Sequence, residues 1–65
     1  MTLGDSVEWL GHPSVYLVID ESDTSVQLRQ RARSTSYMPW VSKLDVRVLT
    51  EDQAVERLIA EGRSR

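Results

Sequence analysis

Residues 25–33 read Ser-Val-Gln-Leu-Arg-Gln-Arg-Ala-Arg, and their alternation decides the fold class that we expect for this chain. Val26, Leu28 and Ala32 occupy even positions, whereas every arginine of the stretch occupies an odd position. Because successive side chains of a strand point to opposite faces of a sheet, this pattern predicts a half-buried strand. One face of that strand would contribute to a core. The other face would carry a row of guanidinium groups, those of Arg29, Arg31 and Arg33.

Length and composition restrict the class of protein. A chain of 65 residues is expected to form a single domain, which buries only about 60% of its unfolded surface. The sequence has no cysteine, which excludes disulfides and cysteine-based zinc sites. The longest wholly apolar run, residues 15–19, is too short to span a membrane, and the N-terminus lacks the features of a secretory signal. We therefore expect a soluble, cytoplasmic protein that does not associate with membranes.

Charge is distributed unevenly along the chain, although the formal net charge is only −2. Residues 1–23 contain five acidic residues and no lysine or arginine. Residues 24–49 contain a single acid and five bases, which are Arg29, Arg31, Arg33, Lys43 and Arg47. This asymmetry predicts a polarised surface with a basic face.

The remaining patterns predict four further strands and a short helical turn. Apolar residues occupy both parities of residues 15–20, which indicates a central strand. Pro39 cannot donate to a strand ladder, so the segment that contains it should lie at a sheet edge. Residues 41–44 have the length of one 3₁₀ turn. The expected strands, besides residues 25–33, are residues 6–10, 15–20, 37–41 and 45–49.

A helix is expected over about residues 51–61. Thr50 and Gln53 form a capping box, in which each side chain accepts a hydrogen bond from the other residue's backbone N–H. Gly62 is placed to end the helix, which leaves residues 62–65 as a tail. One apolar stripe is expected, formed by Ala54, Val55, Leu58 and Ile59. This stripe either docks on the strands, which predicts a monomer, or pairs with a second chain, which predicts a homodimer through the helix.

The order of these elements resembles a small SH3-like barrel of five strands with a 3₁₀ turn before the last strand. Tudor-like and KOW-like members of that class are similar over roughly residues 3–49, in the segments Gly4-Asp5-x-Val7, Tyr16-x-Val18, Val26-x-Leu28 and Val46-x-Val48-Leu49. The acidic and aromatic loop of peptide-binding SH3 domains and the glycine-centred KOW motif are absent. The short, cysteine-free frame with a C-terminal helix is also similar to small accessory proteins of phages of GC-rich bacteria. The expected fold is therefore mainly β, a five-stranded SH3-like barrel with one C-terminal α-helix.

The candidate binding surface combines the basic row with an aromatic segment. Alternate side chains on a strand lie about 6.5–7 Å apart, close to the spacing of phosphates along a nucleic-acid strand. Arginines at that spacing also suit carboxylates. Lys43 and Arg47 extend the row, and Tyr37 and Trp40 flank it. We therefore expect a protein–protein adaptor or modulator, with nucleic-acid binding through the same arginines as the alternative. Solvation of an outward face is a third interpretation of the row.

No pattern in the sequence indicates catalysis. His12 has no Ser, Cys or carboxylate partner at a recognisable spacing, and the acids of residues 20–23 lack the spacing of a calcium loop. The aromatic residues Trp9, Tyr16, Tyr37 and Trp40 fill the core or rim of a chain without phenylalanine, form a cage for a cation or form a protein-contact patch. We expect a non-enzymatic protein with no metal and no cofactor.

Overall fold

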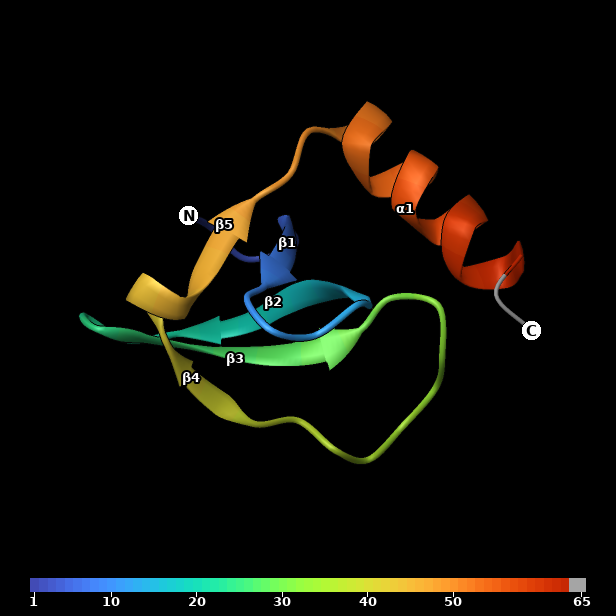
Figure 1. The fold of residues 1–65 in the computed structure, drawn as a ribbon. Coiled ribbons are helices and arrows are strands. Elements are labelled where there is room, and N and C mark those ends of the chain that lie inside the picture. Colours follow the sequence, from blue (N-terminus) through green and yellow to red (C-terminus); the bar gives the residue numbers. More distant parts are fainter. Residues whose placement is uncertain (64–65) are drawn as a thin grey trace.

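The computed structural model describes residues 1–63, which form one antiparallel sheet and one C-terminal helix. The strands lie in the order β4-β3-β2-β1-β5, and the helix packs against β1 and β2, on the far side of the molecule from β4 (Figure 1). The elements are β1 (Ser6–Trp9), β2 (Val15–Glu21), β3 (Ser25–Gln30), β4 (Trp40–Ser42), the 3₁₀ turn η1 (Lys43–Asp45), β5 (Val46–Val48) and α1 (Glu51–Arg63). The expectation of a mainly β fold with one C-terminal helix is confirmed.

The sheet is open and does not close on itself, so the expected SH3-like barrel is not confirmed. Strands β4 and β5 lie at opposite edges of the sheet and do not pair within the described residues. Each of these edge strands has only three residues, and η1 alone joins them. Strands this short offer few backbone groups with which to close the sheet on itself.

Two hydrophobic clusters lie on the two faces of the sheet. The larger cluster fills the concave face and consists of Val7, Tyr16, Val18, Val26, Leu28, Val41 and Val46, with Met1 and Trp9 packed against it. The smaller cluster consists of Val15, Leu49 and Ala54, with Leu58 against it. Strand β2 contributes to both clusters, as expected for a central strand, although Leu17 and Ile19 are only half-buried.

The helix docks on the sheet through only part of the expected stripe. Ala54 is fully buried and Leu58 is half-buried, whereas Val55 is 41% exposed and Ile59 is 51% exposed. The helix is oriented by polar contacts as well as by apolar ones, because Glu61 Oε1 accepts a hydrogen bond from the backbone N–H of Val15 at 3.0 Å. The expected stripe therefore divides, with one half packed and the other half facing outward.

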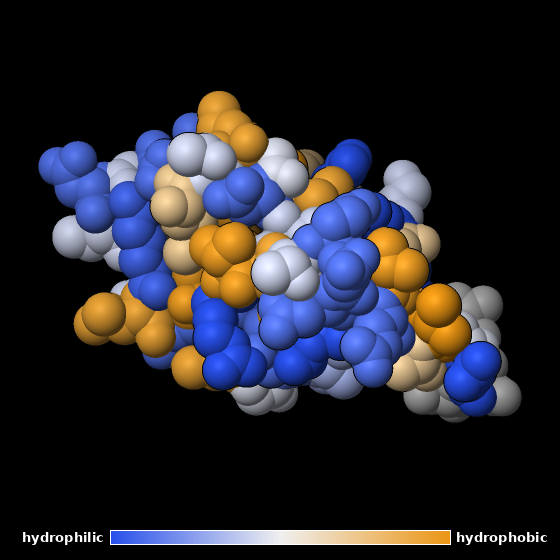
Figure 2. Space-filling view, turned by 90° about the horizontal axis from the view of Figure 1, so that it is seen from above, coloured by the Kyte–Doolittle hydropathy of each residue, from blue (hydrophilic) through white to orange (hydrophobic). Residues whose placement is uncertain are grey.

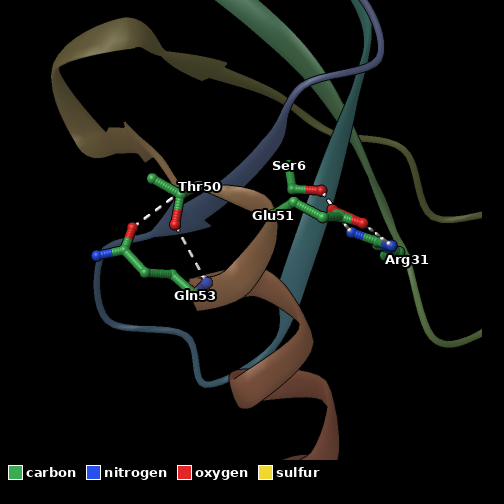
Figure 3. Close-up of polar contacts among 5 residues, drawn as sticks. All are labelled: Ser6, Arg31, Thr50, Glu51 and Gln53. Atoms are coloured by element: carbon green, nitrogen blue, oxygen red, sulfur yellow. Dashed lines mark hydrogen bonds and ion pairs between the residues drawn. The ribbon is translucent and has the colours of Figure 1, made fainter.

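The capping box of α1 is present as expected. The N–H of Thr50 donates to Gln53 Oε1 at 3.0 Å, and the N–H of Gln53 donates to Thr50 Oγ1 at 3.2 Å (Figure 3). The C-terminal boundary differs from the expectation, because α1 continues through Gly62 to Arg63. Residues 64–65 of the expected tail lie outside the described residues.

Strand β3 ends at Gln30, three residues earlier than its alternation predicts. The N–H of Arg31 still donates to the carbonyl of Val15 at 2.9 Å, after which the chain bends away from the sheet. Strand β4 begins only at Trp40, because the preceding Pro39 has no N–H to donate. The carbonyl of Pro39 nevertheless accepts a hydrogen bond from Leu28 at 3.0 Å, and β4 forms a sheet edge, as expected.

Candidate functional site

Arg31 does not belong to an exposed basic row, because it links the sheet to the helix. Its Nη1 donates to Ser6 Oγ at 2.8 Å and to Glu51 Oε1 at 2.9 Å, and its Nη2 donates to Glu51 Oε2 at 3.1 Å (Figure 3). This bidentate contact lowers the pKa of Glu51 and raises the pKa of Arg31. The guanidinium group therefore holds the first turn of α1 against β1.

Two further cations of the expected surface are also bound to carboxylates. Lys43 Nζ lies 2.9 Å from Glu21 Oε2. Arg47 donates to Glu8 Oε1, and Arg57 of α1 lies 3.2 Å from the other oxygen of Glu8. The hydrogen bond from Arg47 is the main cause that lowers the pKa of Glu8, against the opposing effect of burial. Lys43 and Arg47 are therefore neutralised locally and do not extend a basic patch.

Arg29 and Arg33 have no ion pair within the described residues. Arg29 is exposed on β3, whereas Arg33 is exposed on the segment that follows the strand. Arg31 differs from both of them, because its guanidinium group is bound to Glu51. Arg29 and Arg31 point to the same face of the sheet, because Arg31 contacts Ser6, and Ser6 pairs with Leu17, the partner of Arg29.

The outer face of the sheet brings Arg29 and Trp40 together. Arg29 pairs with Leu17 of β2, and Gln27, two residues before Arg29 on the same face, pairs with Trp40 of β4. The carbonyl of Met38 accepts a hydrogen bond from Gln27 Nε2 at 3.0 Å, so Met38 lies beside Gln27. We call the set Gln27, Arg29, Met38 and Trp40 the outer β3–β4 surface.

This surface is left uncovered by the helix. The buried residues under α1 on the same face of the sheet are Val15, which begins β2, and Leu49, which follows β5, whereas β4 lies at one edge of the sheet, far from α1 (Figure 1). Trp40 is 50% exposed and Met38 is 39% exposed. An apolar area next to an unpaired guanidinium group therefore faces outward.

Tyr37, the remaining residue of the expected site, lies outside this surface. It is 65% exposed in the segment between β3 and β4, and its N–H donates to Thr35 Oγ1 at 3.1 Å. It lies near enough to the buried Tyr16 to contribute, after the larger effect of burial, to the raised pKa of that phenol.

The aromatic residues do not share one role. Trp9 and Tyr16 pack edge to face with ring centroids 5.5 Å apart, and His12 stacks on Trp9 at 3.6 Å. This arrangement confirms core packing for Trp9 and Tyr16. Within residues 1–63 no ring contact involves Tyr37 or Trp40, so the four rings do not enclose one common space.

Sequence reasoning missed Met38 and Gln27 as members of the outer β3–β4 surface. The sequence did contain a signal, which was spacing by two residues. Met38 lies two residues before Trp40, and Gln27 lies two residues before Arg29. It also missed Glu8, whose carboxylate binds arginines of both β5 and α1.

The described residues contain no cluster of three or more His, Cys, Asp or Glu residues that would hold a metal ion. Within the same residues no helix has the length and apolar character needed to cross a membrane. No protein-family model matches the chain, and the searches of curated proteins and of solved structures likewise find no similar protein.

Proposed function

We propose that this protein is a small, non-enzymatic binding module that recognises an acidic segment of a partner protein through the outer β3–β4 surface. The observation that carries the proposal is the half-exposed Trp40 beside the unpaired Arg29, on the part of the sheet that α1 leaves uncovered. Large aromatic residues and arginine are the side chains most enriched where protein interfaces derive their binding energy.

An SH3-like architecture is part of this proposal. The strand order β4-β3-β2-β1-β5 and the 3₁₀ turn before β5 support it. A relation to Tudor-like or KOW-like domains, an origin as a phage accessory protein and a cytoplasmic location are proposed on the sequence pattern and composition alone.

The chemistry of the surface favours a carboxylate-bearing partner. An unpaired guanidinium group binds a carboxylate through two parallel hydrogen bonds. The indole of Trp40 and the thioether of Met38 supply adjacent apolar area for a neighbouring hydrophobic side chain. Pro39 and the three-residue length of β4 leave few backbone groups for strand addition, so recognition would depend mainly on side chains.

Nucleic-acid binding, the alternative, has less support. Of the five cations expected to contact phosphates, Arg31, Lys43 and Arg47 are bound to carboxylates of the chain itself. It stays a prediction, tested by the electrophoretic mobility of single-stranded and duplex oligonucleotides over a salt series. Affinity that falls steeply with salt would favour phosphate binding over the proposed function.

Binding to an array of peptides that vary in net charge and hydrophobic content tests the proposed function. We expect acidic peptides with one large apolar residue to bind, and we expect both Trp40→Ser and Arg29→Glu to abolish that binding. Leu44→Ser is a matched control because Leu44 is also apolar and is 89% exposed, away from this surface. Arg33→Glu makes the same charge change as Arg29→Glu outside the surface. Equal loss in the controls, or no preference for acidic peptides, would refute the proposal.

A further inference from the structure

The outward side of α1 carries a depression formed by four residues of the helix. Glu56, Ile59, Ala60 and Arg63 line a hollow of about 500 Å³. Their spacing of i, i+3, i+4 and i+7 is that of the hole that receives a side chain from the facing helix in a helix pair. This hollow lies on the side of α1 opposite to Ala54, which packs on the sheet.

Exposed apolar area borders this hollow. Ile59 is 51% exposed and Val55 is 41% exposed, whereas the other large apolar residue of the described helix, Leu58, packs against the sheet. Figure 2 looks down on this side of the molecule and shows hydrophobic residues at the end that carries α1, interspersed with polar ones. The helix therefore packs apolar residues on its inner side and also exposes apolar residues on its outer side.

The charges beside the hollow have no partner within the described residues. Neither Glu56 nor Arg63 forms an ion pair there, whereas Glu51 and Arg57 both bind residues of the sheet or its adjoining segment. Glu56 and Arg63 are also too far apart to bind each other, because seven residues of helix span about 10.5 Å. Along the described helix, no opposite charge occurs three or four residues from either of them.

The four positions that line the hollow are complementary to the same four positions of a second copy in antiparallel orientation. Glu56 and Arg63 are equidistant from the point midway between Ile59 and Ala60, and their charges are opposite. A second helix in antiparallel orientation therefore places its Arg63 against Glu56 and its Ala60 against Ile59, and two-fold symmetry repeats both contacts. A parallel helix in the same register would instead place Glu56 against Glu56.

We propose that two copies of this protein associate through an antiparallel contact between their α1 helices, centred on Ile59 and Ala60. The small side chain of Ala60 lets Ile59 of the other copy approach closely. Salt bridges between Glu56 and Arg63 fix the orientation. The contact uses a face of the molecule other than the outer β3–β4 surface, so it stands independently of the proposed function.

Sedimentation equilibrium of the full chain, from micromolar to millimolar concentration, tests the pairing. We expect a concentration-dependent dimer that Ile59→Asp abolishes while the far-ultraviolet circular dichroism is unchanged. Glu56→Arg and Arg63→Glu, each alone, turn two attractive contacts into repulsive ones and should raise the dissociation constant by roughly 10-fold or more. A mixture of these two variants should regain the dimer, because every contact between unlike copies then joins opposite charges.

Two controls separate this contact from other modes of association. Asp23→Arg changes the net charge by the same amount as Glu56→Arg but lies in the turn between β2 and β3, so it should leave the dimer unchanged. Trp40→Ser removes the indole of the outer β3–β4 surface and should also leave the dimer unchanged. A monomer at all concentrations, a dimer indifferent to Ile59→Asp, a dimer lost with Trp40→Ser, or no recovery in the mixture would overturn the proposal.

Discussion

Replacing Glu61 with alanine tests the contact that ties the C-terminal half of α1 to the sheet. The carboxylate accepts a hydrogen bond from the N–H of Val15, a residue whose exposure is 0%. Its removal leaves that N–H without its acceptor, which costs about 1–3 kcal/mol, and the higher helix propensity of alanine offsets a few tenths of that loss. We expect the free energy of unfolding to fall by about 1–2 kcal/mol, which lowers the melting temperature by roughly 4–16 °C in a domain of this size.

Glu61→Gln is the matched variant, because glutamine keeps an oxygen acceptor and loses only the charge. A negative charge near a helix C-terminus is unfavourable, so its loss does not destabilise the helix. We expect Glu61→Gln to remain within about 0.5 kcal/mol of the parent protein. Urea unfolding followed by far-ultraviolet circular dichroism and tryptophan fluorescence measures both variants. If alanine were as stable as glutamate, the carboxylate would not anchor the helix, and if glutamine were as damaging as alanine, the anchor would depend on the charge and not on the acceptor oxygen alone.

Three other predictions concern the core, the helix cap and the response to acid. Leu28 is fully buried, so Leu28→Ala should cost about 2–5 kcal/mol, a large part of the stability of so small a domain, and should lower the urea midpoint sharply. Thr50→Ala should lower the stability by about 1 kcal/mol, and Thr50→Ser should restore most of it in the same titration. Because arginine contacts lower the pKa of Glu8 and of Glu51, their stabilisation is complete above the ordinary carboxyl pKa and is lost as the pH falls through the lowered values. The urea midpoint should therefore decrease between about pH 5 and pH 2, and by less in Glu8→Gln; an equal decrease in that variant would contradict the assignment.

Local patterns predicted the elements of this fold well, since those patterns arise from neighbouring residues. The alternation of Val26 and Leu28 and the capping box at Thr50 specify a strand and a helix start without reference to the rest of the chain. Arg31 could not be assigned in this way, because its partner Glu51 lies twenty residues later. Its parity continued the strand pattern, and its N–H still binds the carbonyl of Val15, although β3 ends one residue earlier.

The rotation of the helix was also beyond local reasoning. Ala54, Val55, Leu58 and Ile59 lie within one broad apolar stripe, and periodicity does not say which part of it faces the sheet. Contacts with residues far along the chain determine the answer, because the carboxylate of Glu61 binds β2 and the guanidinium group of Arg57 binds Glu8. The same contacts leave Ile59 outward, which is the basis of the proposed dimer.

The division of the interior into a larger and a smaller cluster implies two separable cooperative units. The cluster under α1 has only three buried members, whereas the concave face has seven. Detaching the helix therefore breaks few apolar contacts and leaves the hydrogen-bonded strands intact. In native-state hydrogen exchange, the amides of α1 should exchange through this partial opening, before those of β2 and β3.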